Sequence, residues 1–65
     1  MERAEQQLRL IRAVYRVESV RHSGKDLAEL RARCDALLDS TLALVDGDMR
    51  LEDLLADIRR QINPV

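Results

Sequence analysis

Residues 26–62 read DLAELRARCDALLDSTLALVDGDMRLEDLLADIRRQI, and this stretch decides the fold. Its apolar side chains recur every three or four residues, which is the period of an α-helix that buries one face. The repeat runs through Leu27, Leu30, Cys34, Leu37, Thr41, Leu44, Leu51, Leu55, Ile58 and Ile62. Leu51 follows Leu44 by seven residues, so the helical register continues across Gly47. The pattern therefore predicts helix on both sides of this glycine.

Gly47 leaves two interpretations open. A glycine within a helix costs only ~1 kcal/mol relative to alanine, so one continuous helix over 26–62 would keep the apolar residues on one face. Asp46 favours a break instead, because a carboxylate is unfavourable near a helix C-terminus. Asp48 also favours a break, since aspartate is a good N-cap for a new helix. We predict two helices, over residues 26–46 and 49–62.

The preceding block predicts a further helix. Residues 2–22 contain neither glycine nor proline, and Ser23-Gly24 interrupts the chain directly after them. Asp26, with Glu29 three residues later, resembles a capping box, which predicts that the next helix begins there. We therefore expect a single small helical domain over 1–65. Its fold class is all-α: an antiparallel helical hairpin plus a shorter third helix, a three-helix unit that oligomerisation is expected to complete.

The composition narrows the class of protein. The 65 residues include 11 leucines, one tyrosine and no phenylalanine or tryptophan, which is typical of leucine-rich helix packing. A hydrophobic content of 46 % with a net charge of −1 excludes the disordered class. The single cysteine, Cys34, cannot form an intrachain disulfide or a zinc cluster, and its place in the repeat predicts a small buried side chain. These features predict a cytoplasmic protein with no membrane partner, metal or cofactor.

Residues 2–22 carry more apolar surface than one neighbouring helix can cover. One flank consists of Leu10, Ala13, Val14, Val17 and Val20, and the other of Leu8, Ile11 and Tyr15. Soluble monomers rarely leave a large contiguous apolar patch in water. We therefore predict a partner interface on this helix, with candidate residues Leu8, Leu10, Ile11, Val14, Tyr15, Val17 and Val20. Tyr15 is expected to be the strongest contact, because it combines a large apolar area with a hydroxyl group.

The function that this pattern favours is protein–protein interaction. We expect a small adaptor, chaperone-like or regulatory subunit that acts as a homodimer or binds a larger protein. The sequence contains no glycine-rich phosphate loop and no paired nucleophile and base, so an enzyme is not expected. The alternative is a dimeric helical nucleic-acid-binding regulator that uses Arg9, Arg12 and Arg16. A net charge of −1 and a single aromatic residue make nucleic acid the less favoured partner.

Overall fold

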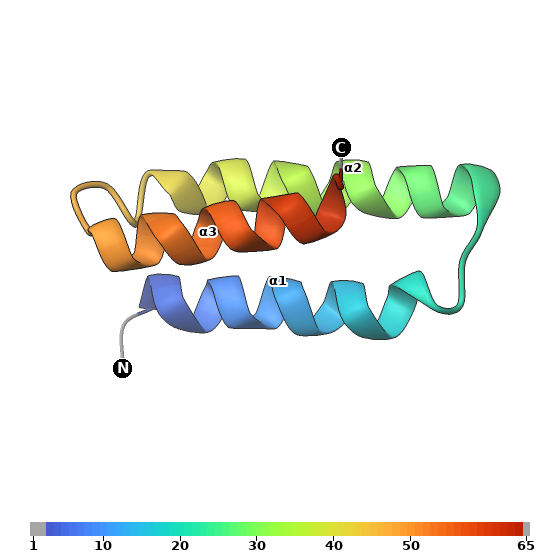
Figure 1. Ribbon diagram of the computed structural model, residues 1–65, viewed down its shortest axis with the longest axis horizontal. Coiled ribbons are helices and arrows are strands. Elements are labelled where there is room, and N and C mark those ends of the chain that lie inside the picture. Colours follow the sequence, from blue (N-terminus) through green and yellow to red (C-terminus); the bar gives the residue numbers. More distant parts are fainter. Residues whose placement is uncertain (1–2, 65) are drawn as a thin grey trace.

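The chain forms an antiparallel helical hairpin with a third helix folded back along it (Figure 1). The computed structural model describes residues 3–64, which contain α1 (Arg3–Ser19), α2 (Gly24–Leu42) and α3 (Met49–Ile62). The predicted all-α, three-helix architecture is confirmed. The chain breaks around Gly47, so the continuous helix over 26–62 is not formed.

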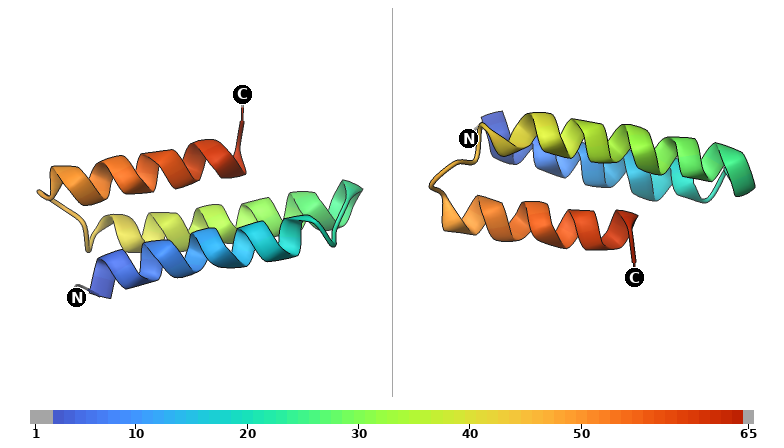
Figure 2. Two further views of the ribbon diagram at one scale, coloured as in Figure 1. Left: turned by 60° about the horizontal axis from the view of Figure 1, so that its bottom comes forward. Right: turned by 90° about the horizontal axis from the view of Figure 1, so that it is seen from above.

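The three helices make two layers of unequal extent. Figure 2 shows α1 and α2 side by side in one layer, with α3 on one side of it. The third helix ends near the middle of α2 and leaves the connection between α1 and α2 beyond its reach (Figures 1 and 2). The Cα atoms extend over 36 × 23 × 15 Å. In the described part of the chain, α3 therefore covers one broad side of the hairpin, and the opposite side has no covering layer.

The connection between α1 and α2 differs from the prediction at both ends. The first helix ends at Ser19 rather than at residue 22, and the backbone N–H of Arg21 donates to the carbonyl of Glu18 at 3.0 Å in a closing turn. Gly24 adopts the left-handed region, with φ +57°, and begins α2 two residues earlier than expected. The predicted capping box is wrong, because Asp26 already lies in the first turn of α2. The predicted start at residue 2 lies outside the described residues.

The connection between α2 and α3 begins earlier than predicted and ends where predicted. The second helix ends at Leu42 rather than at residue 46, because the backbone tightens into i→i−3 turns that bring the N–H of Val45 to the carbonyl of Leu42 at 3.2 Å. Gly47 then takes φ +83°, a conformation that L side chains rarely adopt. Asp48 caps α3 as predicted, and its carboxylate accepts from the backbone N–H of Leu51 at 3.2 Å.

The core lies between α3 and the hairpin. Its buried apolar residues are Ala4, Leu8, Ile11, Leu30, Cys34, Leu38, Val45, Leu51, Leu55, Ile58 and Ile62, joined by the buried polar residue Thr41. The buried residues continue from Leu38 of α2 to Val45 in the following turn, whereas the predicted repeat passes through Leu37 and Leu44, both of which are exposed. Both paths have helical spacing, so the period alone does not choose between two adjacent apolar residues. The position of α3 makes the choice.

Candidate partner-binding face

The two apolar flanks of α1 have opposite environments. Leu8 and Ile11 are buried in the core, and Tyr15 packs against it partly buried. The other flank remains in solvent: the exposed fractions of Leu10, Val14 and Val17 are 63 %, 43 % and 54 %. These three residues follow one another at i, i+4 and i+7, so they form one stripe along the helix. The structure thus identifies which of the two flanks remains exposed to solvent.

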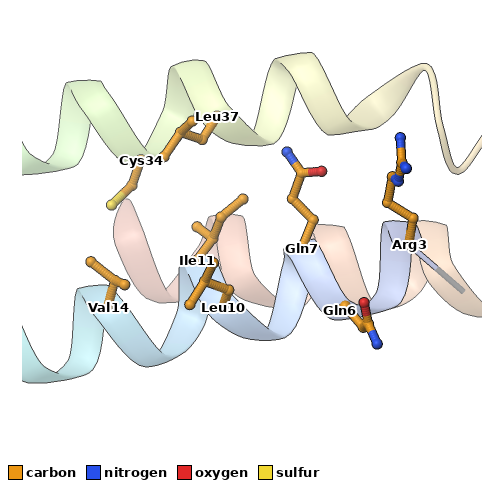
Figure 3. A pocket seen from close by; sticks show the side chains of 8 residues that line it. All are labelled: Arg3, Gln6, Gln7, Leu10, Ile11, Val14, Cys34 and Leu37. Atoms are coloured by element: carbon orange, nitrogen blue, oxygen red, sulfur yellow. The ribbon is translucent and has the colours of Figure 1, made fainter. Parts of the chain in front are cut away.

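The exposed stripe borders a groove between α1 and α2. The groove has a volume of about 390 Å³ and is lined by Arg3, Gln6, Gln7, Leu10, Ile11, Val14, Cys34 and Leu37. Figure 3 shows the Cys34 sulfur pointing from α2 toward α1, while Gln7 and Arg3 extend from α1 toward α2. The ribbon of α3 lies behind this layer in the same view. We call the surface formed by Leu10, Val14, Val17 and Leu37 the open face.

The candidate interface residues from the sequence therefore divide into two groups. Leu10, Val14 and Val17 lie on the open face, and Val20 is exposed beyond the end of α1. The chain itself covers Leu8 and Ile11, so a partner would reach them only if the helices separated. The Tyr15 hydroxyl accepts from Nε of Arg31 at 3.4 Å, which directs the ring toward α2 within the chain.

Leu37 is the open-face residue that the sequence argument placed elsewhere. The helical repeat predicts Leu37 on the same buried face as Cys34, three residues earlier, yet its exposed fraction is 43 %. The signal that could have identified it is the pair Leu37-Leu38, two adjacent large apolar residues on one helix. Successive helical residues point about 100° apart, so only one of the two can face the same neighbour.

Cys34 forms part of the floor of the groove, and its side chain is buried as predicted, with an exposed fraction of 2 %. Burial is the main cause that raises the pKa of the Cys34 thiol above its ordinary value. The neighbouring Asp35 carboxylate raises this pKa further, and Arg33 lowers it. A raised pKa disfavours the thiolate, which is the nucleophilic form of cysteine. This environment is the opposite of the one that activates a catalytic cysteine.

We expect native Cys34 to react with a thiol reagent on the order of a hundredfold more slowly at pH 7 than Cys34 in the urea-unfolded chain, because reaction requires both opening of the helices and loss of a proton. Reaction followed by mass spectrometry in the absence and presence of urea measures this ratio. Equal rates in the two conditions would show that the groove exposes a reactive thiol.

The arginine strip proposed for nucleic acid lies on another side of α1. Arg9 forms an ion pair with Glu5 at 2.8 Å, and Arg50 of α3 approaches the same carboxylate at 3.4 Å. The Glu5 side chain is only 14 % exposed, so this carboxylate offsets cationic charge from two helices. Arg12 is partly buried and Arg16 is exposed. The strip is therefore partly engaged in contacts within the chain.

Over residues 3–64 the structure contains neither a side-chain cluster suited to a metal ion nor a membrane-spanning helix. In that range no group of three or more histidine, cysteine, aspartate or glutamate side chains is arranged to hold a metal ion. None of the helices in the same range has both the length and the apolar content needed to cross a membrane. Comparison of the sequence and the structure with known protein families, curated proteins and solved structures gives no match.

Proposed function

We propose that this chain is a small helical protein–protein interaction module whose open face is the binding surface. The observation that carries the proposal is the exposure of Leu10, Val14 and Val17 on the side of α1 that faces away from the core. Leu37 of α2 extends this apolar surface across the groove. Large apolar side chains that gather on one face of a small domain are a common feature of docking surfaces.

The energetics of a small domain support the same proposal. The accessible surface of the chain is 4644 Å², which is larger than the roughly 4,250 Å² expected from the size scaling of folded monomers at 7.5 kDa. The chain therefore exposes more surface than a typical monomer of its size. Fully burying one valine or leucine side chain contributes ~1.5 to 3 kcal/mol. The open face carries four such side chains, each about half exposed, so its burial would add stability comparable to that of a small domain's own core.

The open face suits binding rather than chemistry. Its centre is apolar, its single thiol is buried with a raised pKa, and polar side chains gather at the end formed by Arg3, Gln6 and Gln7. A catalytic site would require an activated nucleophile or base directed into the groove. We therefore assign the chain the role of an adaptor, a chaperone-like protein or a regulatory subunit that acts through a protein partner.

Site-specific photo-crosslinking in cells tests the proposal. A photoreactive amino acid at Val17 should give a covalent adduct with a protein, because this side chain would lie within the contact. The same amino acid at Met49 is the matched control, since Met49 is 78 % exposed at the start of α3, away from the open face. Adducts that are equally abundant at both positions, or absent at Val17, would contradict the proposal.

A further inference from the structure

The open face has different charges at its two ends. Arg3 lies beside Gln6 and Gln7 at the end near the start of α1. At the other end, a second hollow is lined by His22, Asp26, Glu29, Leu30 and Arg33. Asp26, Leu30 and Arg33 of this hollow precede Leu37 by 11, 7 and 4 residues, so they follow one stripe along α2 and both hollows lie on the same side of the hairpin. The face thus runs from a guanidinium, through an apolar centre, to two carboxylates accompanied by one guanidinium.

This pattern is self-complementary in one orientation only. If a second copy lies antiparallel on the first, the cationic end of each copy meets the end of the other that carries the carboxylates. A parallel copy would place the like-charged ends together. Complementary charges of this kind determine the register and the orientation of an interface, and they contribute less to its affinity.

The positions along α1 give the same register. The midpoint between Leu10 and Val17 lies 10.5 residues after Arg3, or ~16 Å along the helix axis at 1.5 Å per residue. An antiparallel copy centred on that midpoint brings Arg3 opposite a level ~16 Å beyond the midpoint, past the end of α1 at Ser19. The first turn of α2, which contains Asp26, lies at this end of the hairpin (Figure 1). Centring the apolar stripes therefore brings the end with Arg3 to the end of the second copy that carries Asp26.

The size of the face fits a dimer. The Cα atoms of the chain span 36 × 23 Å across its broad side, a rectangle on the order of 800 Å², so this side is large enough for the ~800 Å² that each partner contributes to an interface of standard size. On this basis, and resting on the proposed function, we infer that the partner on the open face is a second copy of this chain, packed antiparallel about a two-fold axis. The paired hairpins form a four-helix core, with one α3 on each outer side.

Analytical ultracentrifugation of the purified chain tests the dimer. The expected mass at micromolar concentration is twice the chain mass. Leu10→Asp should give a monomer whose helical circular dichroism is retained, because Leu10 is exposed within the chain. Met49→Asp introduces the same carboxylate away from the face and should leave the dimer intact. A monomeric wild-type chain, or a Leu10→Asp variant that stays dimeric, would overturn the inference.

Charge reversal tests the antiparallel register. Arg3→Glu and Asp26→Arg should each raise the dissociation constant on the order of tenfold at low salt, because each change places like charges together twice in the symmetric dimer. An equimolar mixture of the two variants should form a heterodimer of near wild-type affinity, since each copy then meets its complement. A dimer that ignores both changes, or a mixture that shows no recovery, would overturn the antiparallel packing.

The two proposals fail in different ways. If the wild-type chain is monomeric but Val17 still gives an adduct with another protein in cells, the identity of the partner is wrong and the binding face stands. If Val17 gives no adduct of either kind, the proposed function itself fails.

Discussion

Leu38→Ala is expected to leave most of the chain unfolded at 25 °C. Leu38 is fully buried in the cluster that joins the hairpin to α3. Truncating a buried leucine to alanine costs ~2 to 5 kcal/mol, whereas a single core in a chain below ~70 to 80 residues rarely supplies more than ~3 to 5 kcal/mol in total. The loss therefore matches the whole expected stability of the fold.

Leu37→Ala is the matched control for this prediction. The two residues are neighbours on α2 and undergo the same chemical change, but Leu37 lies on the open face. Its truncation should change the free energy of unfolding much less in the isolated chain, because Leu37 is already 43 % exposed whereas Leu38 is fully buried. Urea titrations followed by circular dichroism at 222 nm compare the two variants. Equal unfolding midpoints would contradict the assignment of Leu38 to the core and of Leu37 to the open face.

The sequence alone does not predict which of the two neighbouring leucines, Leu37 or Leu38, faces the core. The spacing of leucines was sufficient for three helices, and the Asp48 cap and Gly47 were sufficient for the break before α3. Choosing Leu38 over Leu37 required the direction from which α3 approaches. That direction depends on the turns over 43–48, whose backbone path the sequence pattern does not define.

The helix ends were less predictable than the helices. The chain leaves α1 at Ser19 although the apolar pattern continues to Val20, and α3 does not reach that end of the hairpin (Figure 2). Continued helix there would gain no additional burial against α3. The second helix likewise ends at Leu42, and Val45 reaches the core from a turn instead of a helix.

The candidate face was predictable in part. The sequence indicated that α1 has two apolar flanks and that its own hairpin leaves one of them in solvent. It did not indicate which flank, because Leu8 and Ile11 are chemically similar to Leu10 and Val14. The side of the hairpin on which α3 packs distinguishes them, and that choice involves residues more than 40 positions away along the chain.

Ile11→Asp and Val17→Asp are therefore expected to have different consequences, although both residues belong to the predicted interface. Ile11 is 4 % exposed. Its replacement removes a buried side chain worth ~2 to 5 kcal/mol and puts a carboxylate in a place where an unpaired charge is strongly unfavourable. We expect Ile11→Asp to lose its helical circular dichroism at neutral pH and, as a result, its partner.

Val17→Asp should lose the partner and keep the fold. Val17 is more than half exposed, so its carboxylate remains hydrated in the isolated chain and costs little there. In a complex the same carboxylate would be desolvated against apolar side chains, which opposes binding. Circular dichroism and sedimentation of both variants, with Arg12→Asp as a charge control outside the open face, measure the two effects separately. If Val17→Asp unfolded the chain as completely as Ile11→Asp, the stripe through Leu10, Val14 and Val17 would belong to the core, and α1 would have no free apolar flank to offer.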